Sequence, residues 1–101
     1  MKMGSVQISV KAEADIDSIV EYTKGQWGRR QADEYLSRLE DGFALLFRNP
    51  LVGRPCDSVR AGLRRFEVGK HVVFYLPTAD GILIARVLHQ RMLPAKSRFE
   101  P

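Results

Sequence analysis

The sequence has few of the residues and patterns that mark secreted, membrane-spanning or metal-binding proteins. It contains one cysteine, Cys56, so a disulfide scaffold is excluded. No stretch approaches the roughly 20 apolar residues that a bilayer-spanning helix needs. No cluster of His, Cys, Asp and Glu has metal-ligand spacing, and the sequence has no glycine-rich phosphate loop. We therefore expect neither a metal nor a cofactor.

The first residues and the lone thiol both indicate a reducing compartment. Only a short apolar run follows residues 1–5, with no small-residue cleavage site, so we expect no secretory signal. A single free thiol fits the cytoplasm, where we expect this protein to act. No histidine is close to Cys56 in the sequence, so a small loop residue is a better interpretation than a nucleophile.

Length and charge narrow the class further. The chain has 101 residues, of which 45% are apolar and 28% charged, as in an ordinary globular domain. We expect one domain over residues 1–101, which excludes a large enzyme with separate cofactor and substrate domains. The net charge is +4. Residues 1–50 hold seven basic and eight acidic groups, whereas residues 51–101 hold nine and four. The surplus lies in the second half, and the total is too small to predict direct DNA binding.

The first half predicts a short strand and a helical hairpin. Apolar residues alternate over residues 6–10, which indicates a half-buried strand. Apolar residues at helical spacing follow over residues 12–27 and, after Gly28, over residues 29–48. Gly28 can end the first helix in a left-handed conformation, and proline after Asn49 ends the second. So short a connection predicts two antiparallel helices.

The second half predicts a loop followed by an antiparallel meander. The expected elements are a loop over residues 49–62 and strands over 63–68, 71–76 and 82–89. A two-residue link at Gly69-Lys70 and a four-residue turn at 78–81 are short enough for antiparallel hairpins. The expected fold class is α+β: an N-terminal strand, a helical hairpin and a three-stranded antiparallel meander in one sheet.

Both faces of the last expected strand are largely apolar. Ile82, Ile84, Arg86 and Leu88 share one face, and the residues between them share the other. We therefore expect this strand to be central and covered on both sides. The two helices can cover one face of the sheet. The other face needs a further covering, and we interpret this excess apolar surface as a sign of a partner protein.

Four side chains have two interpretations each. Arg86 lies in an apolar strand, so it lines an anion-binding cleft or pairs internally with Glu67 or a carboxylate of the first helix; we favour the ion pair. His89 is a general acid or base, or a histidine satisfied by backbone groups at a strand end; we favour the second. We expect His71 to face solvent. Trp27 is a core residue or an exposed anchor for a partner, and we favour the core.

Several short motifs, in this order and spacing, resemble those of one protein family. The motifs are Ala14-Asp15-Ile16 with Ile19, Tyr22-Thr23, Gln26-Trp27-Gly28, Gln31-Ala32, Asn49-Pro50-Leu51, Gly53-Arg54-Pro55, Gly62-Leu63-Arg64-Arg65-Phe66, His71-Val72-Val73-Phe74-Tyr75 and Arg86-Val87-Leu88-His89-Gln90-Arg91-Met92. The chain resembles the ParE toxins of bacterial toxin–antitoxin systems, within the RelE/ParE superfamily. The matching features cover nearly the whole chain.

The resemblance implies a fold, a partner and a target. The implied fold is a helical hairpin packed on an antiparallel sheet. The implied partner is a ParD-like antitoxin, a ribbon-helix-helix DNA-binding protein with an acidic C-terminal segment, giving a hetero-oligomer. ParE toxins are held to inhibit DNA gyrase and block replication, so we expect no catalysis. The alternatives are a RelE-like ribosome-dependent mRNA interferase and an antitoxin-binding homologue that has lost toxicity.

The tail after the last strand helps to choose between these alternatives. RelE-like ribonucleases often use a C-terminal tyrosine for proton transfer, and residues 90–101 contain none, although His89 could substitute. The chain departs from the ParE pattern at Leu93, where an acidic residue commonly follows the Arg-Met pair. This departure puts the potency or the target in question.

We name two sets of candidate site residues. The target-binding candidates are Arg64, Arg65, Arg86, His89, Arg91, Lys96 and Arg98. A ribonuclease would use Arg64, Arg65, Arg86 and His89 from that set. The antitoxin-binding candidates are Ile19, Tyr22, Trp27, Tyr35, Leu39, Phe74 and Tyr75.

Overall fold

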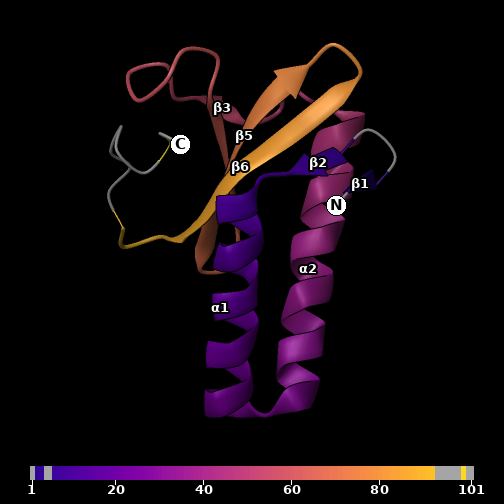
Figure 1. Ribbon diagram of the computed structural model, residues 1–101, viewed down its shortest axis with the longest axis vertical. Coiled ribbons are helices and arrows are strands. Elements are labelled where there is room, and N and C mark those ends of the chain that lie inside the picture. Colours follow the sequence, from indigo (N-terminus) through magenta and orange to yellow (C-terminus); the bar gives the residue numbers. More distant parts are fainter. Residues whose placement is uncertain (1, 4–5, 93–98, 100–101) are drawn as a thin grey trace.

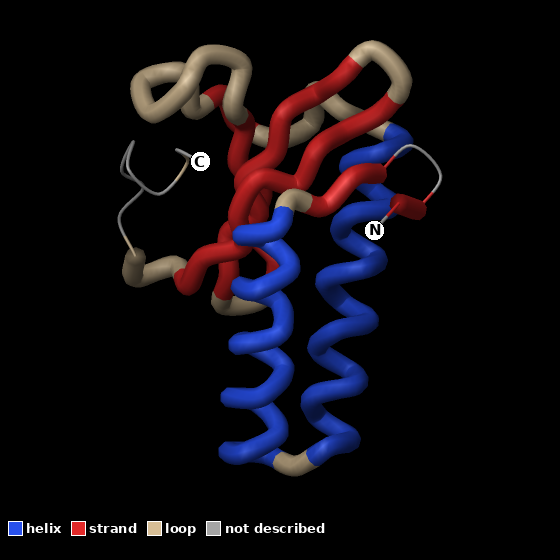
Figure 2. The backbone as a smooth tube through the Cα atoms, viewed as in Figure 1, coloured by secondary structure: helices blue, strands red, loops and turns tan. Residues whose placement is uncertain are grey.

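A computed structural model of the chain shows a helical hairpin beside a six-stranded sheet, and it describes residues 2–3, 6–92 and 99. In chain order the elements are β1 (Lys2–Met3), β2 (Val6–Ile8), α1 (Val10–Trp27), α2 (Arg29–Arg48), β3 (Arg54–Pro55), β4 (Arg64–Val68), β5 (His71–Thr78) and β6 (Gly81–His89). The closed end of the hairpin extends well beyond the sheet (Figures 1 and 2). None of the described helices is long and apolar enough to span a bilayer.

The sheet has the strand order β1-β2-β6-β5-β4-β3. β4, β5 and β6 form the expected antiparallel meander. β2, however, pairs with β6 in parallel, so the sheet is mixed rather than wholly antiparallel. β6 lies between β2 and β5 and is central, as predicted. The first and last strands of the sheet, β1 and β3, have two residues each and were not expected. Pro55 suits β3 because an edge strand tolerates the missing N–H.

A β-bulge in β6 changes which residues share a face. Phe74 pairs with Arg86 but Tyr75 pairs with Ile84, so Ala85 is the extra residue. The bulge reverses the alternation, and Val87 instead of Leu88 joins Ile84 against the helices. The facing expected for Leu88 is therefore wrong. The turn before β6 is also shorter than expected, because Thr78 pairs with Gly81.

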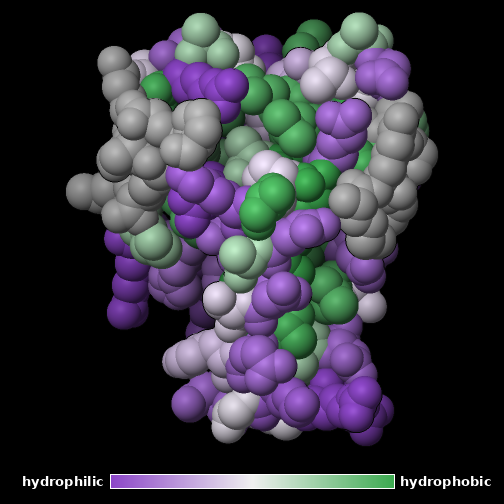
Figure 3. Space-filling model, in the orientation of Figure 1, coloured by the Kyte–Doolittle hydropathy of each residue, from purple (hydrophilic) through white to green (hydrophobic). Residues whose placement is uncertain are grey.

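The hairpin is fixed at its ends and packs closely on the sheet. Ser9 caps α1: its hydroxyl accepts a hydrogen bond from the amide of Ala12 at 3.0 Å. Gly28, with φ of +89°, is the one-residue link that turns the chain into α2, as predicted. Gly42 allows α2 to approach the sheet, since a Cβ there would lie 2.9 Å from Cγ2 of Val68. Polar side chains cover much of the outer surface of the hairpin (Figure 3).

Two apolar clusters fill the two faces of the sheet. The cluster under the helices includes Leu39, Phe43, Leu46, Tyr75 and Ile84. The cluster on the other face is formed by Leu63, Val72, Phe74, Ala85, Leu88 and Phe99, with Cys56, Val59 and Leu76 packed against it. The chain's own loop before β4 and Phe99 therefore cover the second face. The interpretation of this apolar face as a sign of a partner protein is therefore wrong.

Candidate functional site

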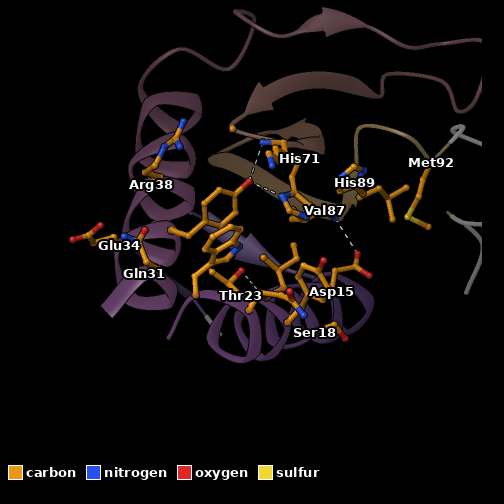
Figure 4. Close-up of a pocket in the computed structure, with 18 of the residues that line it drawn as sticks. Asp15, Ser18, Thr23, Gln31, Glu34, Arg38, His71, Val87, His89 and Met92 are labelled. Atoms are coloured by element: carbon orange, nitrogen blue, oxygen red, sulfur yellow. Dashed lines mark hydrogen bonds between the residues drawn. The ribbon is translucent and has the colours of Figure 1, made fainter. Parts of the chain in front are cut away.

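A groove of about 840 Å³ opens between the hairpin and the end of the sheet where β5 begins and β6 ends. Its walls are Ser18, Ile19, Tyr22, Thr23, Gln26, Trp27, Gln31, Glu34, Tyr35, Arg38, Gly69, Lys70, His71, Arg86, Val87, Leu88, His89, Met92 and Asp15. Figure 4 shows Gln31, Glu34 and Arg38 of α2 on one side of it, Asp15, Ser18 and Thr23 of α1 on another, and His71 and His89 on the sheet. The groove is the natural candidate for a binding site because it is large and partly apolar.

Two large aromatic side chains stand exposed on the α1 wall of the groove. Tyr22 is 68% exposed and Trp27 is 71% exposed. Trp27 ends α1 about 25 Å from its start, at 1.5 Å per residue, beyond the part of the helix that the sheet covers. The interpretation of Trp27 as a core residue is therefore wrong, and the exposed-anchor interpretation fits its position. Aromatic residues at such positions are the side chains that most often dominate protein–protein binding.

Tyr35 joins α2 to the turn between β4 and β5. Its hydroxyl lies 2.5 Å from Nδ1 of His71 and 3.2 Å from the carbonyl oxygen of Val68, and it accepts a hydrogen bond from the amide of Lys70 at 3.1 Å. The Tyr35 hydroxyl has one proton to donate. If Nδ1 of His71 carries a hydrogen, it donates to the hydroxyl, and Tyr35 can donate its own proton to the carbonyl oxygen of Val68, so that all four groups have partners. Gly69 is required here, since a Cβ would lie 2.7 Å from the Tyr35 hydroxyl. The groove wall is thus held rigidly at this corner.

The two histidines lie side by side on adjacent strands. His71 pairs directly with His89, and their rings meet edge to face at 5.4 Å between centroids. Burial, and secondarily the neighbouring His89, lowers the pKa of His71 from 6.5 to about 4. His71 is therefore neutral near pH 7, and it is half-buried rather than solvent-facing as expected. His89 accepts a hydrogen bond at Nδ1 from the backbone amide of Arg91 at 3.1 Å, which is the backbone-satisfied interpretation favoured above.

Arg86 forms the internal ion pair that the sequence favoured. Its Nε and Nη2 donate to the two carboxylate oxygens of Asp15 at 2.8 and 2.7 Å, and the side chains are only 17% and 13% exposed. Asp15 also accepts the amide of Val87 at 3.0 Å. β2 ends at Ile8, so it does not pair with the part of β6 that follows Ile84. There the side chains of Ser9 and Asp15 bond to backbone groups of β6 in place of a strand. The Asp15 hydrogen bonds also raise the pKa of Arg86, which stays charged.

The other cationic candidates in the described part of the chain, Arg64, Arg65 and Arg91, do not line the groove. Arg64 donates from Nη1 to the carbonyl oxygens of Leu51 and Gly53 at 3.1 and 2.6 Å. The guanidinium of Arg65 lies over the ring of Phe74. Arg91 is exposed beyond β6. Lys96, Arg98 and Leu93 lie outside the described residues. Of the target-binding set, the structure places Arg86 and His89 on the groove.

The antitoxin-binding candidates fall into two groups. Ile19, Tyr22, Trp27 and Tyr35 all line the groove. Leu39, Phe74 and Tyr75 are buried in the chain's own core, so they offer no surface to a partner and leave the candidate set. The sequence reasoning did not include Met92 and Lys70, which lie where strand ends meet the hairpin. Their position depends on how the hairpin crosses the sheet, which periodicity does not report.

Within the described part of the chain, no group of three or more His, Cys, Asp or Glu side chains could hold a metal ion. The histidine pair lacks a third ligand there. The fold and the site define the class as a small α+β domain with an open groove between its helical hairpin and its sheet.

Comparison with known proteins places the chain in one family. Residues 6–94 match the family described as "ParE toxin of type II toxin-antitoxin system, parDE". Toxin ParE1 of Mycobacterium tuberculosis (strain ATCC 25618 / H37Rv) is 40% identical over 84% of this chain and 88% of its own. Toxin ParE1 of Caulobacter vibrioides is 39% identical over 89% and 93%. Toxin ParE of Escherichia coli is 34% identical over 84% of each chain.

A solved structure has the same fold. A chain of the "Chromosomal ParDE TA system from P. aeruginosa" matches with a TM-score of 0.73 and 22% identity, over 88% of this chain and 98% of that one. The chain belongs to the ParE toxin family and is a toxin of a parDE-type toxin–antitoxin system. The family expected from the sequence motifs is thus confirmed.

Proposed function

We propose that this protein arrests growth by binding and inhibiting DNA gyrase, and that a ParD-like antitoxin neutralises it by binding in the groove. The observation that carries the proposal is the match to the ParE family over residues 6–94. The groove adds a physical reason, since Tyr22 and Trp27 expose large aromatic surfaces beside buried Ile19. An amphipathic helix of the antitoxin would fill such a groove with its apolar face.

Trp27 is the sharpest test of antitoxin binding. We expect Trp27→Ala to weaken antitoxin binding at least tenfold, because truncation of an aromatic anchor costs about 2 kcal/mol or more. Titration calorimetry with a ParD-like antitoxin measures this. Val10→Ala is the matched control, since Val10 is 84% exposed at the other end of α1. Equal affinity of the Trp27→Ala variant and the wild type would contradict the proposed site.

We further propose that inhibition involves binding without catalysis. Two of the arginines that a ribonuclease would need, Arg64 and Arg86, donate to acceptors of the protein itself. His71 and His89 give the interferase alternative its best support, because they lie together in the groove with Tyr35. The proposal therefore keeps this alternative as the second candidate function.

Two assays separate the candidates. Purified gyrase should lose supercoiling activity when the toxin is added and regain it when the antitoxin follows. Primer extension on translated messages should show no new cuts. Codon-linked cuts with unaffected gyrase would favour the interferase. Normal growth of cells that express the chain without antitoxin would favour a homologue that has lost toxicity.

A further inference from the structure

A second exposed surface lies at the opposite end of α2 from the groove. The loop between α2 and β3 carries Leu51, which is 70% exposed, and Val52, which is 50% exposed, and Phe47 at the end of α2 is also exposed. None of these residues lines the groove. We call Phe47, Leu51 and Val52 the loop patch. Single exposed aliphatic residues are common on protein surfaces, so exposure alone gives the patch no meaning.

The loop that carries the patch is held by two side chains from the sheet. The buried Tyr75 hydroxyl donates to the carbonyl oxygen of Pro50 at 2.8 Å and accepts from the amide of Gly53 at 2.9 Å. Arg64 donates to the carbonyl oxygens of Leu51 and Gly53. The amide of Val52 donates to the carbonyl oxygen of Asn49 at 3.0 Å. The backbone of residues 50–53 is therefore fixed by bonds to two strands, although its side chains are exposed.

Gly53 shows how tightly the loop is fitted. A Cβ at this position would lie 2.5 Å from the Tyr75 hydroxyl and 2.9 Å from the carbonyl oxygen of Arg65. Burial raises the pKa of Tyr75, so its hydroxyl keeps the proton that it donates to Pro50. A surface that is rigid before binding loses little conformational entropy on binding, which favours affinity. The hydrogen bonds from Tyr75 and Arg64 therefore give the loop patch a rigid backbone, which scattered exposed residues lack.

The charge around the patch specifies its partner. Residues 48–65 contain five arginines and one acidic residue, Asp57, a local surplus as large as the +4 of the whole chain. Arg48 and Arg54 flank the patch and are exposed. Glu67 on β4 pairs with Arg54 and offsets one of these charges. An apolar patch flanked by two arginines complements a protein surface that has an apolar socket edged by carboxylates.

We propose that the loop patch binds a surface of the toxin's target protein that has an apolar centre edged by acidic residues. The groove remains the antitoxin site. This inference rests on the proposed function, because it divides toxin action and antitoxin binding between two surfaces. On α2 the groove is lined by residues from Gln31 to Arg38, whereas the loop patch begins at Phe47 and continues into the loop that follows the helix.

The test is the double variant Leu51→Ser/Val52→Ser, with Val10→Ser as the control for an exposed aliphatic residue elsewhere. We expect the double variant to inhibit gyrase at least tenfold more weakly and to arrest growth correspondingly less. We expect its antitoxin affinity to stay within twofold of the wild type. Thermal unfolding checks the fold, and the single variant Leu51→Asp provides the same test if the double variant unfolds.

Charge variants supply a second arm. Arg48→Gln/Arg54→Gln should slow association with gyrase at low salt, and Arg29→Gln/Arg30→Gln, exposed at the other end of α2, should not. A loss of duplex DNA binding in the Arg48/Arg54 variant, with Leu51→Ser/Val52→Ser unaffected in all assays, would make this a nucleic-acid surface and overturn the proposal.

The outcomes distinguish the inference from the proposed function. If the wild type inhibits gyrase and arrests growth, and the double variant does both equally, the loop proposal is wrong and the proposed function stands. If antitoxin affinity falls in parallel with toxicity, the patch belongs to the antitoxin interface and the proposal is again wrong. If the wild type itself leaves growth and gyrase unaffected, the proposed function fails, and the loop proposal fails with it.

Discussion

The two faces of the sheet are covered in different ways. Two long helices pack on one face, over a cluster that includes Leu39, Leu46 and Tyr75. On the other face, the loop before β4 and Phe99 cover a smaller cluster that includes Leu63 and Phe74. The ring of Phe99 meets that of Phe74 edge to face at 5.1 Å. The face that looked unpartnered in the sequence is therefore closed, and the better-covered face is the one that opens into a groove.

The two coverings also leave different side chains exposed. The helices extend beyond the part of the sheet that they cover (Figure 1), and Tyr22 and Trp27 of α1 are 68% and 71% exposed. The connection between α2 and β4 covers the smaller cluster on the other face, and it leaves Leu51 and Val52 exposed at its start. Each covering therefore exposes apolar side chains outside the cluster that it buries.

The largest expected effect is the loss of stability when one buried leucine on each face of the sheet is replaced by alanine. We expect Leu39→Ala to cost about 4 kcal/mol of unfolding free energy, because two helices and the sheet cannot close the cavity. Leu63→Ala should cost about 2 kcal/mol, since the loop above it can settle into the space. Both residues are 0% exposed, so their burial does not bias the comparison.

Urea denaturation of both variants with unchanged m-values measures this difference. Equal costs would mean that the loop is as rigid as the helices. A larger cost at Leu63 would reverse the comparison.

The next effect concerns the seam where α1 meets the sheet. Asp15→Ala should cost about 3 kcal/mol, because it leaves Arg86 without its carboxylate and the amide of Val87 without an acceptor. Asp17→Ala is the control, since Asp17 is exposed on the same helix. If both variants unfold at the same urea concentration, the ion pair contributes nothing net. Circular dichroism gives both midpoints.

Much of the fold followed from local patterns in the sequence. The period of the apolar residues gave both helices and the meander, and Gly28 gave the tight connection. The direction of β2 and the bulge at Ala85 were missed, because they depend on how distant segments pair. One extra residue in a strand moves every later side chain to the opposite face of the sheet. Nothing in the apolar pattern of residues 82–89 marks the position of the bulge.

The site was only partly predictable, for a similar reason. Tyr22 and Trp27 were identified as candidates from their residue type, but periodicity alone put Trp27 in the core. Helix length held a signal, since the rise per residue places position 27 far from the sheet. Leu39, Phe74 and Tyr75 are of the same residue types as the exposed candidates, and only the packing of the chain shows that they are buried.

The smallest expected effect depends on pH and lies at the open end of the helix-covered face. The pKa of His71 is about 4 in the folded chain and about 6.5 when unfolded. Between these values the unfolded chain binds more protons, so the stabilisation is complete above pH 6.5 and is lost as the pH falls toward 4. Because His71 is partly exposed, we expect a loss on the order of 1 kcal/mol.

His71→Gln should remove this loss, whereas His89→Gln, which removes the secondary cause, should only reduce it. Thermal unfolding from pH 7.5 to 4 measures all three proteins. If His71→Gln loses as much stability at low pH as the wild type, the burial of His71 does not make the stability of the helix-covered face depend on pH. The other face has no histidine among its cluster residues, so the two faces would then not differ in the pH dependence of their stability.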